Sequence, residues 1–347
     1  MLVEYTNIHE EKYCSFLNKI TGQNHFSYSF KNPFEYYVSD SVAEVKLWLL
    51  IVQEEVVASV TTKKQKYIVN GEEEDIYNIK NPISLAIVDR EYNYASLVLI
   101  SSIREQFKKS FLLGMGGKNS QVAKIFSKFD YLAHTIPFYV KPIAPIPFLL
   151  FNPLVQKLLD IDRKLPNPLR NELHWKGFSL KYVAHFDNFN YPRNYLNTSF
   201  SLKRTAFLLD VQAPNSMRCF LKLIVSKNGK DIGYITLFEA SPRKHKMFGS
   251  INIWCLLDCF VDFECILPRE LNKLLSRAAR AAGVDALIMN TASRETIEFL
   301  RKSKWIKIRS NFAISLSPQL ATQIGSERNM IITRLDGDGP INMGVSF

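Results

Sequence analysis

Residues 83–109, in the N-terminal half, show three patterns of hydrophobic and polar positions in succession. Hydrophobic residues over 83–88 predict a buried strand, and residues 89–93 form a polar turn. Apolar positions at helical spacing then predict an amphipathic helix over 94–109. Free backbone N–H groups at a helix N-terminus bind anions, so this strand–turn–helix unit is a candidate anion site.

The elements around this unit alternate between strands and helices. Apolar residues at helical spacing predict a helix near the N-terminus that ends at Gly22, and a polar turn joins two strand-like runs into a hairpin. The predicted order after the first helix is a strand over 45–52, a strand over 56–62, a polar excursion over 63–80, the strand–turn–helix unit, a strand over 111–115, a helix over 121–129 and a strand over 133–140.

The C-terminal half repeats this order. Asn228-Gly229 predicts a hairpin turn, and Pro268 and Gly283 mark the start and the end of a helix. The predicted elements are strands over 219–225, 232–238 and 250–257, a polar turn over 258–264, a helix over 267–282, a strand over 286–289, a helix over 295–304, and strands over 306–316 and 329–334. Because the same elements recur with similar lengths, the sequence predicts a duplicated domain.

Composition limits the class of protein without identifying it. The chain has 347 residues, enough for two domains, and its 47% hydrophobic content is that of an ordinary globular protein. The formal net charge of +11 is compatible with a nucleic acid, a membrane surface or an anionic cofactor as partner. The basic residues are scattered along the chain, so charge alone selects none of these partners.

Targeting and metal signals are weak. The N-terminus has no signal-peptide pattern, and the most apolar run, 142–156, is too short and too rich in proline to span a membrane. The five cysteines fit no zinc spacing, so we expect a cytoplasmic protein without disulfides and without a metal. Asp336 and Asp338 are each followed by a glycine but do not complete a calcium loop, and we expect them in a surface turn.

The element order resembles the GNAT-type N-acyltransferase fold, present twice over residues 1–140 and 180–335. This resemblance implies an α/β chain, of the α+β kind with mixed sheets, that holds two GNAT-like acyltransferase domains in tandem. We expect these domains at 1–141 and 180–347, joined by a proline-rich linker over 142–179. A tandem arrangement of this size is also similar to the Fem-type aminoacyl transferases.

The resemblance implies a donor site at the strand–turn–helix unit. In the family, acyl-CoA lies between the fourth and fifth strands, and its pyrophosphate lies on a turn with glycines. Asn93, Ser96 and Val98 stand at the motif positions of the first half, which therefore lack those glycines. The donor-site candidates implied for acyl-CoA, such as acetyl-CoA, are Ile87, Val88, Asn93, Tyr94, Ala95, Ser96, Gly116 and Gly117.

The catalytic signature is incomplete. Asp89 is the carboxylate best placed to act as a base, and Asn119 matches an Asn of the family motif. The family's acid Tyr is replaced by Phe126, which has no proton to transfer. In the second half, Ser293 and Leu300 occupy the two positions. The loop that covers the acceptor in this fold would contribute Glu35, Tyr36 and Tyr37.

Three functions are compatible with these patterns. The first is transfer of an acyl group from acyl-CoA to an amine acceptor such as an amino sugar or an amino acid. The second is a tRNA-dependent aminoacyl or peptidyl transferase of the Fem type, which the net charge of +11 allows. The third is a non-catalytic binding or scaffold protein, because both halves lack the phosphate-binding glycines and the acid Tyr.

Overall fold

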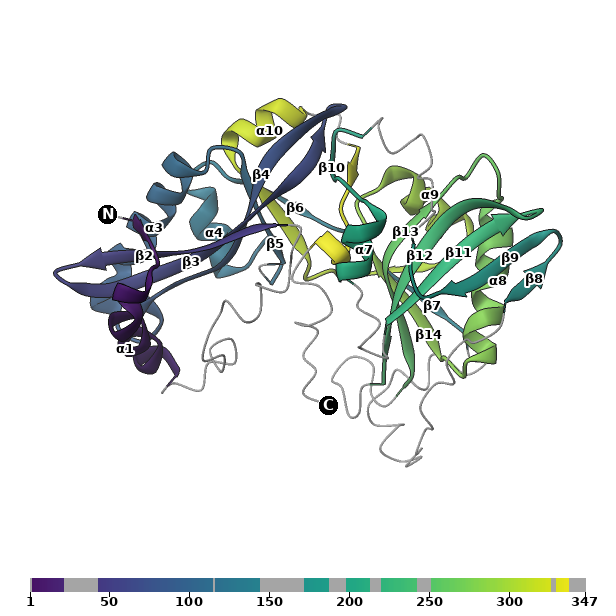
Figure 1. The fold of residues 1–347 in the computed structure, drawn as a ribbon, viewed down its shortest axis with the longest axis horizontal. Coiled ribbons are helices and arrows are strands. Elements are labelled where there is room, and N and C mark those ends of the chain that lie inside the picture. Colours follow the sequence, from purple (N-terminus) through teal and green to yellow (C-terminus); the bar gives the residue numbers. More distant parts are fainter. Residues whose placement is uncertain are drawn as a thin grey trace. The chain divides into compact units, whose positions relative to one another are not determined.

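The chain forms two compact units, described separately below (Figure 1). Unit 1 comprises Met1–Thr135 and Asn311–Glu327, and unit 2 comprises Ile136–Ser310 and Arg328–Phe347. The computed structural model describes residues 2–21, 43–114, 116–143, 172–186, 198–212, 220–241, 251–325 and 329–336.

Unit 1 is built on one mixed sheet. Its strands lie in the order β1-β2-β3-β4-β5-β16-β6, and β4 and β5 are the parallel neighbours in this row. The strands are β1 (Leu2–Glu4), β2 (Glu44–Val52), β3 (Glu55–Val69), β4 (Glu72–Ser84), β5 (Ser110–Gly114), β16 (Ala313–Leu316) and β6 (Leu132–Thr135). The helices are α1 (Glu10–Thr21), α3 (Asn93–Gln106), α4 (Gln121–Ser127) and α10 (Pro318–Ile324).

The hydrophobic core of unit 1 joins helices to one face of this sheet. Phe16 of α1, Leu99 of α3 and Phe126 of α4 pack in the same cluster as Ile79 of β4 and Leu112 of β5. Apolar residues at helical spacing on α1 therefore face the sheet, as the sequence predicts.

The predicted polar excursion over 63–80 is wrong, because these residues form the long hairpin of β3 and β4. Asn70 and Gly71 form its turn, both with positive φ, as a tight hairpin turn requires. Its charged residues pair across the strands: Lys66 Nζ lies 2.8 Å from an Asp75 carboxylate oxygen. The hairpin is polar on its exposed side, so its composition resembles that of a loop.

The strand predicted over 83–88 is also corrected. β4 ends at Ser84, Leu85–Ile87 forms a 3₁₀ turn, and a second 3₁₀ turn over Arg90–Tyr92 leads into α3. Leu85 is fully buried while Ile87 is about half exposed, so the apolar run is a buried turn rather than a continued strand.

Unit 2 is built on a second mixed sheet. Its strands lie in the order β15-β7-β14-β13-β12-β11-β9-β8, with β13 and β14 as the parallel pair. The strands are β15 (Ile306–Ile308), β7 (Phe138–Pro142), β14 (Ala286–Asn290), β13 (Ile253–Val261), β12 (Lys230–Ala240), β11 (Phe220–Lys227), β9 (Phe178–Val183) and β8 (Leu173–Trp175). The remaining elements are α7 (Ala206–Gln212), α8 (Pro268–Ala281), α9 (Arg294–Lys302), the 3₁₀ turn η6 (Arg334–Asp336) and the parallel pair β10 (Phe200–Leu202) and β17 (Met330–Ile331).

Helix α8 follows its sequence signals closely. Pro268 occupies its first turn, where a missing N–H costs nothing, and Gly283 follows its end with φ +76. Leu271, Leu274 and Leu275 are fully buried in the core of unit 2.

Two strands, β7 and β16, pair in a sheet that is formed mainly by the other half of the sequence. The predicted strand 133–140 is two strands, because β6 belongs to unit 1 and β7 to unit 2. The predicted strand 306–316 is likewise two strands, with β15 in unit 2 and β16 in unit 1. β16 lies between β5 and β6, and β7 lies between β14 and β15. The strand row of unit 1 therefore includes β16 from the C-terminal half, and that of unit 2 includes β7 from the N-terminal half.

This strand exchange divides the chain differently from a simple tandem arrangement. The units are not the consecutive segments 1–141 and 180–347, because residues 311–327 belong to unit 1. Strands β8 and β9 also begin within or directly after the predicted linker 142–179 and pair in the sheet of unit 2.

Two further features concern the whole of the described chain. No helix in the described ranges is both long and apolar enough to cross a membrane. Cys14, Cys255, Cys259 and Cys265 are free thiols. Burial raises the pKa of Cys255 to about 11, so this thiol is unreactive at neutral pH.

Candidate acyl-donor site

The two parallel strands of unit 1 separate at one end. β4 and β5 pair as far as Ile79 and Leu112, the last residues in register. Beyond this pair, β4 continues to Ser84 and β5 continues to Gly114. The two strand ends are not paired to each other over these residues, and this place is called the opening of unit 1.

A β-bulge lies where β4 leaves its neighbour. Asn81 and Pro82 stand opposite the single residue Val60 of β3, and Asn81 has φ +45. A bulge bends the strand that carries the extra residue and increases its local twist. This distortion accounts for the separation of β4 from β5.

Unit 2 repeats this construction at the equivalent place. Its parallel strands pair as far as Leu256 of β13 and Met289 of β14, and Leu257 is the extra residue of a bulge directly beyond. In both units the parallel pairing therefore ends beside a bulge of the first strand, and the equivalent place in unit 2 is called its opening.

The turn that follows β4 in unit 1 is held by two side-chain contacts. Ser84 at the end of β4 and Ser96 in α3 share a hydrogen bond of 2.6 Å between their Oγ atoms. The exposed carboxylate of Asp89 accepts a hydrogen bond of 2.9 Å from the backbone N–H of Glu91. Tyr92 at the N-cap of α3 makes no side-chain capping bond, so the first turn of this helix has no capping side chain.

The predicted donor residues lie together along this turn with different exposures. Ile87 and Tyr94 are 46% and 43% exposed, and Asn93 is exposed as well. Ala95 is buried, and Val88 packs against the core of unit 1. The turn therefore presents an apolar rim to solvent. These placements do not test the roles assigned to the residues, which stay predictions.

The glycines after β5 have two different environments. A Cβ atom added to Gly114 would meet no heavy atom within 4 Å, so open space adjoins the end of β5. A Cβ atom added to Gly117 would lie 3.4 Å from the Cα atom of Asn311, and Gly117 has φ +97. The positive φ of Gly117 favours glycine there, whereas the contact with Asn311 is of ordinary van der Waals length. Gly116 is exposed, with its Cβ position 3.6 Å from Ser120.

The two residues matched to the family motif lie before and within α4 of unit 1. Asn119 is exposed and directly precedes Ser120, whose hydroxyl caps the helix by accepting from the Ala123 N–H at 3.1 Å. Phe126, at the position of the acid Tyr, is buried in the core. The predicted acceptor residues Glu35, Tyr36 and Tyr37 lie outside the described residues.

The opening of unit 2 is filled by the chain itself. The segment 332–336 runs beside the end of β14, where the Ala292 N–H donates to the Ile332 carbonyl at 2.9 Å. Thr291 and Thr333 form an isolated antiparallel bridge, and η6 packs against β13. The Arg334 Nε donates to the Asn290 side chain at 2.6 Å. Protein atoms of segment 332–336 therefore lie at this place in unit 2.

A buried charge cluster fixes this filling segment. The Arg204 guanidinium has no exposed surface and contacts the carboxylates of Asp258 at 2.5 Å and Asp336 at 2.9 Å. Tyr234 donates a hydrogen bond of 2.8 Å to Asp258, and Arg204 also donates to the Ser201 hydroxyl at 2.9 Å. Burial raises the pKa of the Asp336 carboxyl, and the Arg204 charge opposes that shift.

Sequence reasoning missed this cluster and misplaced two of its members. Asp258 was expected in the polar turn over 258–264, but it lies within β13 and is fully buried. Asp336 was expected in a surface turn, yet it is 3% exposed. Arg204 carried no sequence signal, because its two partners are far away along the chain.

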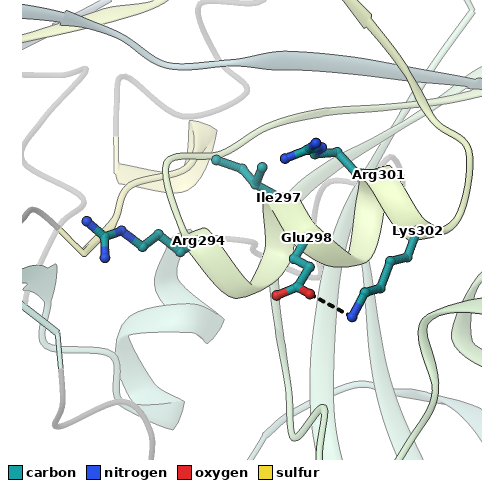
Figure 2. Close-up of a pocket in the computed structure, with 5 residues that line it drawn as sticks. All are labelled: Arg294, Ile297, Glu298, Arg301 and Lys302. Atoms are coloured by element: carbon teal, nitrogen blue, oxygen red, sulfur yellow. Dashed lines mark ion pairs between the residues drawn. The ribbon is translucent and has the colours of Figure 1, made fainter.

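A separate hollow of about 630 Å³ lies against helix α9. Its described lining consists of Arg294, Ile297, Glu298, Arg301 and Lys302 (Figure 2). Glu298 and Lys302 form an ion pair of 2.6 Å, whereas Arg294 extends away from them. This mostly charged lining does not suit an acyl chain. Among the described residues, no group of three or more His, Cys, Asp or Glu side chains could hold a metal ion.

Two solved structures share the architecture of the chain. A conserved protein of unknown function from Enterococcus faecalis V583, described as a probable N-acyltransferase, is 11% identical with a TM-score of 0.55. A GCN5-related N-acetyltransferase from Anabaena variabilis ATCC 29413 is 12% identical with a TM-score of 0.56. Each comparison covers 93% of this chain and 73% of the other.

Sequence comparison adds nothing to this likeness, since no protein-family model and no curated protein matches the chain. At 11% and 12% identity, the likeness to solved structures establishes the fold alone. The parallel strand pair that separates at a bulge, present in both units, agrees with it. The chain has the fold of the GNAT-type N-acyltransferases, built as two units with one mixed sheet each.

Proposed function

We propose that the chain transfers an acyl group from an acyl thioester, acyl-CoA, to an amine. The observation that carries this proposal is the contrast between the two openings. In unit 1 open space adjoins Gly114 where β4 and β5 separate, whereas the equivalent opening of unit 2 is filled by residues 332–336. We therefore assign the donor to unit 1 and one donor to each chain.

The reaction would need little covalent chemistry from the protein. The amine nitrogen attacks the thioester carbonyl, the C–S bond breaks, and CoA leaves as a thiolate that takes up the proton which the amine has given to a base. Backbone N–H groups near the end of β4 would bind the donor arm and polarise the carbonyl. A small amine, such as an amino sugar or an amino acid, is the acceptor that we propose.

We propose Asp89 as the base that takes the proton of the amine. Its carboxylate is exposed at the turn between β4 and α3. Asp89→Asn keeps a capping side chain for the Glu91 N–H but cannot accept a proton. We expect unchanged thermal stability and a fall in kcat of about 100-fold or more. An unchanged kcat over the pH range of activity would remove Asp89 from the mechanism and leave the donor assignment intact.

The donor assignment is tested by calorimetric titration with acetyl-CoA and longer acyl-CoAs. We expect one donor per chain for the wild type and weakened binding for Gly114→Ala, because the added methyl enters the opening. Gly229→Ala is the matched control, since Gly229 also has positive φ and open space around its Cβ position but lies in the β11–β12 turn.

The two variants separate an effect on the donor site from a general effect of backbone strain. Both substitutions place a methyl group at positive φ, so both should lower the melting temperature to a similar extent. Loss of donor binding in Gly114→Ala alone supports the assignment. Binding of two donors per chain, no binding to any acyl-CoA, or equal losses in both variants would overturn it.

A further inference from the structure

A row of cations follows the outer side of helix α8 in unit 2. Arg269, Lys273, Arg277 and Arg280 are all exposed, and at about 100° per residue they fall within roughly 80° around the helix axis. They lie opposite the buried side of α8, which faces the core. The row extends over 11 residues, which corresponds to roughly 16 Å along the helix.

The positive charge gathers further at the tip of the β8–β9 hairpin. Arg277 lies over the ring of Trp175, with 4.1 Å between its Cζ atom and the ring centroid. The Nζ atoms of Lys273 and Lys176 lie 5.7 and 5.8 Å from the same centroid. Three cations around one indole repel each other, and a bound anion would relieve this repulsion.

Carboxylates do not neutralise this row. Among the described residues, no acid lies within ion-pair distance of Arg269, Lys273, Arg277 or Arg280. Glu270 is the one acid of α8, and its carboxylate accepts a hydrogen bond from the Leu267 N–H at 3.3 Å. Within the described part of the chain, the outer side of α8 therefore presents positive charge that no acid pairs.

Exposed aliphatic side chains lie at the N-terminal end of the row. Leu267, directly before α8, is 51% exposed, and Ile306 of β15 is 39% exposed. The two positions belong to the same end of the helix, because the Ser303 hydroxyl donates to the Pro268 carbonyl at 2.9 Å and the Trp305 Nε1 donates to Asn272 at 3.0 Å. Exposed aliphatic groups therefore adjoin the N-terminal end of the row.

We propose that this surface of unit 2, named the α8 surface and made of α8, Leu267, Ile306 and the hairpin tip, binds an anionic lipid membrane. The cations contact the phosphates of the headgroups, and Leu267 and Ile306 enter the boundary with the acyl chains. Polybasic segments next to aliphatic groups bind membranes in this way, with each cation and each buried apolar group adding to the affinity.

The chemistry of the surface favours a membrane over a nucleic acid. Single-stranded nucleic acids are held by aromatic rings on which bases stack, and Arg277 already lies over the ring of Trp175. Exposed aliphatic groups such as Leu267 gain nothing from a phosphate backbone, whereas a bilayer takes them up. The proposal is independent of the donor site, which lies in unit 1.

The test is co-sedimentation of the full chain with vesicles. We compare vesicles of phosphatidylcholine alone with vesicles that hold equal amounts of phosphatidylcholine and phosphatidylglycerol. The variant Arg269→Gln, Lys273→Gln, Arg277→Gln, Arg280→Gln removes four exposed cations. The matched control replaces four exposed lysines of unit 1, Lys108, Lys118, Lys124 and Lys128, with Gln, so both variants have the same net charge.

We expect binding to the anionic vesicles that weakens in high salt. At about fivefold for each cation removed, the α8 variant should bind at least about 100-fold more weakly than the wild type, and the unit 1 control should stay close to the wild type. Equal partitioning of the wild type to both vesicle types, or equal losses in both variants, would overturn the proposal.

A second variant makes the test independent of the stability of helix α8. Leu267→Ser introduces a favoured N-cap residue, so α8 is not weakened, yet the aliphatic group is lost. We expect about threefold to tenfold weaker binding to anionic vesicles in high salt, where the apolar contribution dominates. Binding of single-stranded RNA that falls in the α8 variant, together with vesicle binding that does not, would assign the surface to nucleic acid and exclude the membrane.

Discussion

Arg204 is a cation with no exposed surface, held between the carboxylates of Asp258 and Asp336. Removing one partner of a buried ion pair leaves an uncompensated charge in a medium of low polarity, which is far more costly than the pair itself is stabilising. Arg204 therefore has a structural role, which is to hold the segment 332–336 against β13.

The substitution Arg204→Met should lower the free energy of unfolding by about 3–5 kcal/mol at pH 7. Because burial raises the pKa of Asp336 in the folded state, its ionisation costs stability as the pH rises through that value, and Arg204 limits this cost. The deficit of the variant should therefore shrink as the pH falls from 7 toward the ordinary Asp pKa of about 4. Urea unfolding at several pH values measures it.

A conservative variant serves as the control for charge. Arg204→Lys keeps the positive charge but loses the planar fork that reaches both carboxylates, so its deficit should be smaller and should depend less on pH. A deficit in Arg204→Met that stays constant between pH 7 and pH 4 would contradict a role in compensating the two acids.

Ser84 and Ser96 show how a strand end is tied to the following helix. Their hydroxyls lie 2.6 Å apart, and Ser84 is buried. Replacing one of them by Ala should cost about 1 kcal/mol, because the remaining hydroxyl loses its partner. The double variant should cost less than the sum of the two single variants. Urea unfolding of the four proteins in this cycle measures the coupling, and strict additivity would show that the contact contributes nothing.

At the scale of elements, the sequence predicts what local periodicity determines. Helices α1, α3, α4, α8 and α9 lie within a few residues of the predicted ranges, because their apolar positions recur at helical spacing. The β3–β4 hairpin was missed because cross-strand ion pairs such as Lys66–Asp75 give its exposed side a loop-like composition.

The exchange of β7 and β16 could not be predicted from the sequence. The alternation of inward and outward residues is the same whichever sheet a strand joins, so residues 133–140 and 306–316 each resemble one long strand. What occupies each of the two openings could not be predicted from the sequence either. Whether an opening is filled depends on segment 332–336, which reaches β14 only in the folded chain.

The exchange predicts that a substitution in β16 loosens strands far away in sequence. Ile314 is fully buried and stands in register with Leu113 of β5 and His134 of β6. Ile314→Ala should cost about 2–5 kcal/mol and raise hydrogen exchange in β5 and β6. Hydrogen exchange followed by mass spectrometry resolves the affected peptides.

Val140→Ala in β7 is the reciprocal control. Val140 is buried and stands in register with Ile288 of β14 and Ile306 of β15, so its loss should raise exchange in these C-terminal strands and leave β5 unchanged. The same set of peptides responding to both variants would contradict two separately completed sheets.

At the scale of the whole molecule, each unit is made of two segments that are separate in the sequence. Thr135 at the end of β6 stands in register with Ala313 at the start of β16. A chain that turned directly from β6 into β16 would therefore make unit 1 continuous. The natural chain instead passes into β7 and returns from β15, so each half of the sequence is incomplete by itself.

A rebuilt unit 1 tests this description. Residues 2–135 joined to 313–325 by an Asn-Gly turn should fold cooperatively, because two-residue turns of this kind connect adjacent antiparallel strands. The fragment 1–141 lacks β16 and should not show a cooperative transition. Thermal unfolding followed by circular dichroism compares the two. A folded fragment 1–141 would show that β16 is dispensable for unit 1.

The position of β16 also sets the order in which the chain can fold while it is being made. β5 and β6 leave the ribosome early, but the strand that lies between them follows on the order of 180 residues later. At roughly 5–20 residues per second, this delay is on the order of 10–40 s, during which the facing edges of β5 and β6 are unpaired. Exposed strand edges are sites of aggregation, so the nascent N-terminal half is a natural client for a chaperone until Ala313–Leu316 emerges.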